Sequence, residues 1–344
     1  MRPLLIAATA LFPMPAIAQT PNDIANLTEL IVVEDQVVTL PPSGLKYKNV
    51  TIKRNGKIFI TGSTTILTGK FITESGAAIV YKQSSQPRPK SLLTINAVDA
   101  SGLTQLTVVG DGLSQNGYAP GQRAPDGPNG QGAVTECHGI IPSCSNHSAS
   151  GGQPGQPGAE GPPGESAVDV TLYLPGVKPG AEMVVESIGG TGGRGQDGGH
   201  GGQGGGSNRV HPAANGGPGG SAGSGGRGGD AGNVHVFLVL APADLSKKEE
   251  FIKSVKLTAN IAAGRGGDPG GIGAGGTAGD NSDQFCIGAG CGQGAGSPGA
   301  QAQPGPPGDG PTAGQITQKW VSVEAMDLTS YQSYVAQLWN QLSN

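Results

Sequence analysis

The stretch GGTGGRGQDGGHGGQGGG, residues 189–206, is the basis of the fold prediction, because glycine returns at every third position along it. The same register recurs over residues 217–232 and 264–279, and more sparsely over 121–130, 152–164 and 296–308. A polyproline-II helix has three residues per turn, so this period lines one face with glycine and lets neighbouring chains approach closely. Collagen is excluded because each run holds only about five or six triplets. A flexible glycine-rich linker remains the alternative.

The glycine runs pair by length around short tips. Residues 110–133 and 151–166 flank the tip 134–150, residues 189–206 and 216–232 flank 207–215, and residues 264–280 and 294–310 flank 281–293. We therefore predict three glycine-rich hairpins with six polyglycine-II arms. An arm of about 18 residues would be about 55 Å long at ~3.1 Å per residue.

Short segments with alternating apolar residues separate these arms. Residues 168–174 and 183–185 predict one strand pair, and 92–95 with 106–109 and 234–240 with 255–259 predict two more. Between residues 30 and 109, short β segments recur every six to eight residues, which favours a small β-solenoid or a meander. The predicted fold class is mainly β, with a polyglycine-II or polyproline-II helix bundle on a β-solenoid or β-sheet base.

The C-terminus predicts the one clear α-helix of the chain. Thr329 and Gln332 form a candidate capping box. An apolar seam follows, which packs on the base or contacts another protein: Leu328, Tyr331, Val335, Leu338 and Leu342. The expected regions are a signal peptide (1–18), a β-rich region (19–109), the strand pairs with their arms (110–314), and a strand with the helix (315–344).

The first 18 residues predict export. Arg2 precedes a short apolar run, residues 4–12, and Ala16-Ile17-Ala18 resembles a signal-peptidase site. We expect a secreted, periplasmic or cell-surface protein without a membrane span. A formal net charge of −4 provides no basic surface for nucleic acid.

Four cysteines in an exported chain predict two disulfides. Their spacing favours two local loops, Cys137 with Cys144 and Cys286 with Cys291, although three pairings are open. His138 and His147 flank the first loop, so a Cys/His metal site is an alternative that an oxidising compartment disfavours.

The Gly-Gly-x arms, with two disulfides near them, resemble the polyglycine-II antifreeze proteins of springtails. The paired arms with their tips at one end also resemble phage tail-tip adhesins. The resemblance covers residues 110–310 and is architectural. It implies a rigid glycine scaffold that presents receptor-binding loops.

Catalytic motifs are absent from the sequence. No Walker loop or nucleophile elbow occurs, and Glu249 and Glu250 belong to a Lys-rich insert that predicts a solvated turn. A repeated Arg-x-x-Asp pattern, as in Arg194 and Asp197, predicts surface ion pairs. A calcium β-roll is the alternative, but Gly199 and Gly232 stand where it needs apolar residues. We expect no catalytic residue, no metal and no cofactor.

Non-glycine side chains concentrate in the tips, where rigid scaffolds commonly present binding loops. The candidate binding residues are His138, Ile140, Ile141, His147, Asn208, Arg209, His211, Phe285 and Ile287. We predict a secreted, non-enzymatic protein for adhesion to a glycan, cell-surface or matrix component, or an extracellular structural protein, with a protein partner or self-association through the C-terminal helix. The alternatives are a β-solenoid enzyme acting on polysaccharides and an ice- or crystal-binding protein.

Overall fold

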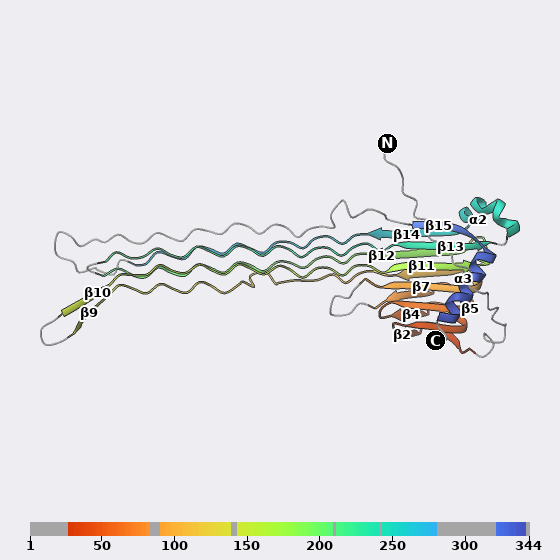
Figure 1. Ribbon diagram of the computed structural model, residues 1–344, viewed down its shortest axis with the longest axis horizontal. Coiled ribbons are helices and arrows are strands. Elements are labelled where there is room, and N and C mark those ends of the chain that lie inside the picture. Colours follow the sequence, from red (N-terminus) through yellow and green to blue (C-terminus); the bar gives the residue numbers. More distant parts are fainter. Residues whose placement is uncertain are drawn as a thin grey trace, which may run out of the picture.

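Two parallel β-sheets form the folded base of the protein (Figure 1). The computed structural model describes residues 27–82, 90–138, 143–208, 211–240, 242–280 and 321–341. Sheet A has seven strands, in the order β1 (Glu29–Val32), β3 (Gly44–Ile52), β5 (Thr64–Thr73), β7 (Leu92–Leu103), β11 (Asp169–Pro175), β13 (Val234–Leu240) and β15 (Val321–Asp327). Sheet B has six, in the order β14 (Lys256–Ala262), β12 (Glu182–Ile188), β8 (Gln105–Val109), β6 (Ala78–Tyr81), β4 (Lys57–Ile60) and β2 (Val37–Leu40).

Successive strands from β1 to β8, and again from β11 to β15, alternate between the two sheets. Within each run, a strand therefore pairs in parallel with the strand two places along the chain. An example is β1 with β3, where Glu29 is the Cα partner of Asn49. The predicted strand–turn–strand pairs were wrong on this point, because β11 pairs with β7 and β13 and not with β12. At the turn after β11, Gly176 has φ +73°, and the chain passes to the opposite sheet instead of folding back.

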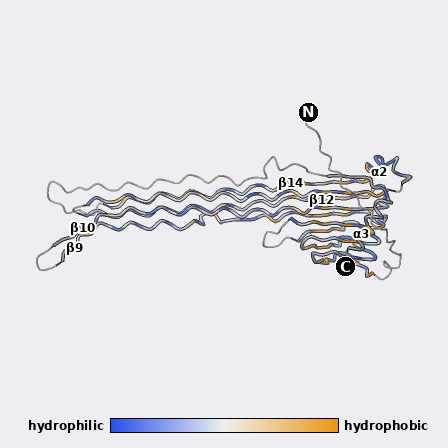
Figure 2. The backbone as a smooth tube through the Cα atoms, viewed as in Figure 1, coloured by the Kyte–Doolittle hydropathy of each residue, from blue (hydrophilic) through white to orange (hydrophobic). Residues whose placement is uncertain are grey.

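The hydrophobic core fills the space between the two sheets. In β12, Met183, Val185 and Ser187 are buried while the residues between them are half-exposed, which is the alternation of a strand with one face on a core. Strands of both sheets contribute fully buried side chains to this core: Ile52, Ile58, Ile66, Ile95, Leu172 and Val236. Burial of each such side chain stabilises the fold by about 1.5–3 kcal/mol. Figure 2 shows that apolar residues gather in this base and are sparse in the long glycine segments.

Extended segments project from one edge of the base (Figure 1), and we call the five within the described residues arms 1 to 5. They comprise residues 110–133, 148–168, 189–207, 213–233 and 263–280. Arms 1, 3 and 5 follow strands of sheet B, while arms 2 and 4 lead into strands of sheet A. The parallel register of the sheets runs on into them. Val170 N donates to Asn233 O in the sheet, and Gly164 N donates to Arg227 O with the same offset in the arms.

Glycine lets the two layers of arms approach to hydrogen-bonding distance. The N–H of Gly193 in arm 3 donates to Pro162 O in arm 2 at 2.8 Å, and Gly226 N in arm 4 donates to Gly193 O at 2.8 Å. A Cβ on Gly192 would lie 2.0 Å from Gly226 O, so no larger residue fits there. Packed sheets with ordinary side chains lie about 10 Å apart. The arms therefore continue the two layers of the base, but without the side chains that keep the two sheets apart.

The predicted fold class was wrong. The regular structure consists of strands in two parallel sheets with short helices, and no polyproline helix bundle is seen within the described residues. The arms extend the sheet register and do not form a separate bundle on a base. A glycine period of three marks the places where chains approach closely, but it does not say which larger assembly they belong to. The expected sixth arm, 294–310, lies outside the described residues.

Helical segments follow two of the sheet A strands. A 3-10 turn η1 (Pro242–Lys247) and helix α2 (Lys248–Ser254) stand between β13 and β14, where a solvated turn was predicted. Helix α3 (Leu328–Gln341) packs on sheet A, burying Tyr331 and Val335 against Leu67 and Val239. The Tyr331 hydroxyl donates to Ala97 O. The seam thus packs on the base through these two residues.

Asp327, rather than the predicted capping box, caps the N-terminus of α3. Its carboxylate accepts the N–H groups of Thr329 at 3.2 Å and Ser330 at 3.0 Å, as an N-cap side chain does. These hydrogen bonds lower the pKa of Asp327. No helix in the described part of the chain is long and apolar enough to cross a bilayer.

Candidate binding tip

A small antiparallel hairpin stands at the far end of arms 1 and 2 (Figure 1). It consists of β9 (Val134–His138) and β10 (Ser143–His147). The Thr135 hydroxyl donates to Asn146 Oδ1 at 2.8 Å across the hairpin. Asn208 Nδ2, from the end of arm 3, donates to Thr135 Oγ1 at 3.3 Å. The hairpin is therefore tied to the turn that joins arms 3 and 4.

The structure places the predicted tip residues at two levels of the hairpin. His138 is the Cα partner of Ser143, whereas His147 is the partner of Val134 at the other end, so the two histidines do not face each other. Cys137 and Cys144 are direct Cα partners, and the local disulfide between them stays a prediction. The side chains of His147 and Val134 are both exposed, that of Val134 by 47%.

Asn208 and His211 form the turn between arms 3 and 4. Asn208 N donates to His211 O at 3.0 Å, and His211 N donates to Asn208 Oδ1 at 2.7 Å. The Nε2 atom of His211 is buried without a hydrogen-bond partner. The remaining predicted residues lie outside the described part of the chain: Ile140, Ile141, Arg209, Phe285, Ile287, Cys286 and Cys291.

Some backbone N–H groups of the arms donate to polar side chains and not to a backbone carbonyl. This capping role was not predicted from the sequence. From arm 1, Ser114 Oγ accepts Thr191 N at 3.0 Å, Asp126 Oδ1 accepts His200 N at 2.7 Å, and Asn129 Oδ1 accepts Gln203 N at 2.9 Å. These polar residues of arm 1 are separated by multiples of three residues, and that spacing was the available signal. Their short side chains reach a neighbouring backbone as helix caps do.

Asp197 is the most connected of these capping residues. It forms an ion pair with Arg194 at 2.6 Å, and a second such pair joins Arg227 to Asp230 at 2.9 Å, so the predicted ion pairs are confirmed at both positions. Its carboxylate also accepts Gly271 N from arm 5 at 2.5 Å and Gly121 N from arm 1 at 3.0 Å. Partial burial alone would raise the pKa of Asp197, but these hydrogen bonds and the Arg194 charge outweigh it and lower the pKa.

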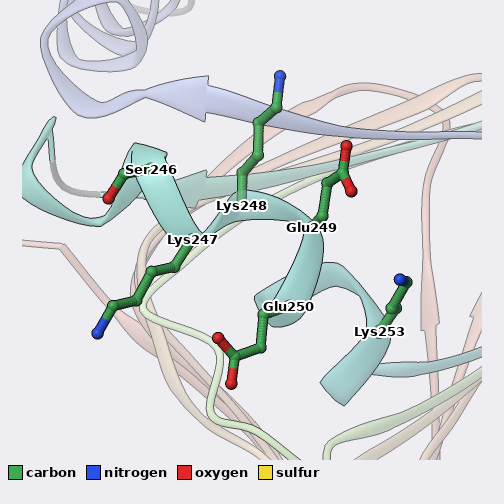
Figure 3. Close-up of a pocket in the computed structure, with 6 residues that line it drawn as sticks. All are labelled: Ser246, Lys247, Lys248, Glu249, Glu250 and Lys253. Atoms are coloured by element: carbon green, nitrogen blue, oxygen red, sulfur yellow. The ribbon is translucent and has the colours of Figure 1, made fainter.

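Two surface hollows in the base lack converging chemical groups. One is lined by residues of η1 and α2, and Figure 3 shows Lys247, Lys248, Glu249, Glu250 and Lys253 pointing in different directions. The other lies over a stack of turns containing Asp35, Asn55 and Gly76, all with positive φ. No group of three His, Cys, Asp or Glu side chains suited to a metal occurs within the described ranges.

Comparisons with known proteins assign no family to this chain. No family model matches the sequence, and no curated protein matches it. Among solved structures, a springtail antifreeze protein from Granisotoma rainieri, described as a nine polyproline type II helical bundle, matches with 22% identity. That match covers 60% of this chain and 97% of the other, with a TM-score of only 0.09. The expected resemblance to springtail antifreeze proteins and phage tail-tip adhesins was wrong, because this fold is a pair of parallel sheets.

Proposed function

We propose that this is an exported, non-catalytic binding protein that adheres to a glycan or to a cell-surface or matrix component through the far end of its arms. The observation that carries this proposal is the position of the β9–β10 hairpin, which stands at the end of the glycine arms and far from the hydrophobic core (Figure 1). A hairpin in this position contributes little to the core and is free to contact a partner.

The hydrogen bonding of the arms supports a rigid platform under the tip. Three successive amides of arm 3 donate to three different neighbours: Gly189 to Ala262 O, Gly190 to Glu165 O, and Thr191 to Ser114 Oγ. A chain held on three sides loses its freedom when the protein folds and not when a partner binds. Binding through a preorganised surface then costs less conformational entropy.

The test compares a tip variant with a base variant on the same surfaces. The double substitution Val134→Ser, His147→Ala changes two exposed Cα partners of the hairpin. Ile31→Ser, Val37→Ser changes two aliphatic residues that are 51% and 49% exposed in the base. Labelled full-length protein is applied to a glycan array and to immobilised extracellular-matrix proteins, and bound label is measured.

We expect the wild-type protein and the base variant to bind and the tip variant to lose at least tenfold in affinity, about 1.4 kcal/mol. Retained binding by the tip variant would overturn the assignment of the site. Absence of binding to every surface would overturn the adhesive function itself.

A further inference from the structure

His200 caps an amide of arm 5 in a way that requires one protonation state. Its Nδ1 atom accepts the backbone N–H of Ala274 at 2.9 Å. A backbone N–H can only donate, so Nδ1 must carry a lone pair and the imidazole must be neutral. Protonation of Nδ1 would place its N–H opposite the N–H of Ala274, and two donors cannot form this hydrogen bond.

We propose that His200 is an acid-sensitive latch for one amide of arm 5: it caps the Ala274 N–H at neutral pH and releases it in mild acid. Backbone hydrogen bonds such as Gly201 N to Ala274 O join arms 3 and 5 in both states. Histidine is the side chain whose protonation ordinarily falls between pH 5 and 8. Among the other caps, the Ser114 hydroxyl and the Asn129 amide do not titrate in that range, and the pKa of the Asp197 carboxyl is lowered by its hydrogen bonds and by Arg194. The latch therefore responds where its neighbours do not.

The adjacent cap provides an internal reference. Gly271, three residues before Ala274, donates to Asp197, which is three residues before His200. In both caps, a side chain of arm 3 accepts one backbone N–H of arm 5. The lowered pKa of Asp197 keeps its carboxylate ionised in mild acid, so the Gly271 cap persists there.

The charged groups beside His200 come from arms 1 and 3. Arm 1 contributes Asp126, whose Oδ1 accepts His200 N, and Arg123. Arm 3 itself contributes the Arg194–Asp197 pair. Arm 5 carries Asp268 and Asp280, but these lie beside Gly195 and Ser207, and it has no charged residue between 269 and 279. Arm 2 carries Glu160 next to Ala159, which pairs with Gln196, and arm 4 has no charged residue between 217 and 226.

Amide hydrogen exchange of the full-length protein tests the latch directly. The protection factors of Ala274 and Gly271, corrected for the intrinsic effect of pH, are measured at pH 7.5 and pH 5. We expect Ala274 to lose about tenfold in protection in acid, as for one net hydrogen bond, and Gly271 to stay unchanged.

Two variants separate the latch from other causes. His200→Asn retains an acceptor of the kind that Asn129 uses on Gln203, so Ala274 should be protected equally at both pH values. His200→Ala should give Ala274 the lower protection factor, about tenfold below that of the wild type at pH 7.5, at both pH values. Equal protection of wild-type Ala274 at the two pH values, or an acid-dependent loss that persists in His200→Asn, would overturn the proposal.

Discussion

Asp197 Oδ1 accepts the backbone N–H of Gly271 at 2.5 Å, joining residues 74 positions apart in the sequence. The same carboxylate binds Arg194 and the Gly121 amide, so a single side chain connects arms 1, 3 and 5. Its side chain is only 16% exposed. Removal of this carboxylate takes a charged acceptor from the partly buried Gly271 N–H and from Arg194, and hydrogen bonds to charged groups are among the stronger ones.

Asp197→Ala should therefore destabilise the protein by about 1–3 kcal/mol, measured by urea denaturation at pH 7. Asp230→Ala is the matched control, because that ion pair is half-exposed and should change stability by less than about 1 kcal/mol. Equal effects of the two substitutions would show that the shared carboxylate does not hold the arms together.

The stabilisation from Asp197 also depends on pH with a definite sign. Its pKa in the folded protein is lowered, so the contribution is present above the pKa of the unfolded chain and is lost as pH falls through the folded value. We expect the stability difference between wild type and Asp197→Asn to shrink as pH falls below the ordinary aspartate pKa of about 4. Denaturation at a series of pH values measures it, and a constant difference would contradict the assignment.

Glycine at the contact positions of the arms should not tolerate even one methyl group. Gly192→Ala places Cβ 2.0 Å from Gly226 O, so the arms must separate locally and lose hydrogen bonds. At Gly132 the nearest atom to an added methyl group is 3.7 Å away, an ordinary contact. We expect Gly192→Ala to lower the melting temperature and Gly132→Ala to leave it nearly unchanged. Similar melting temperatures would mean that the arms are not packed this closely.

Asn96 offers a stabilising substitution. Its side chain is fully buried on the face of sheet A that carries Leu67 and Tyr173 as its Cα partners, and neither amide atom has a hydrogen-bond partner. An unsatisfied buried amide costs about 1–3 kcal/mol. Asn96→Leu, of similar size, should raise the free energy of unfolding by about that amount. A loss of stability would reveal a polar partner for Asn96.

The cysteines of the tip hairpin should form a local disulfide. Cys137 and Cys144 are opposite one another in the antiparallel pair β9–β10, an arrangement that brings two Cα atoms close together. Proteolysis without reduction, followed by mass spectrometry, should yield a linked peptide containing both residues. A link from Cys137 to Cys286 or Cys291 would contradict the local pairing.

Local patterns in the sequence predicted which segments approach one another closely and which segments form strands. The glycine period located the contacts later seen at Gly192 and Gly226, the apolar alternation located β11 and β13, and the Arg-x-x-Asp spacing predicted the Arg194–Asp197 pair. These features depend on local periodicity, which says which face of a chain meets another chain.

The pairing of particular segments with one another is visible in the three-dimensional fold and could not be predicted from the local patterns. Parallel pairing of β11 with β7 and β13, the continuation of both sheets into the arms, and the caps from Asp197 and His200 to arm 5 all join residues far apart in sequence. A repeated glycine pattern is compatible with many partners. The choice among them depends on the register that the buried faces of the two sheets impose, because a shift of one residue would move every core side chain into water.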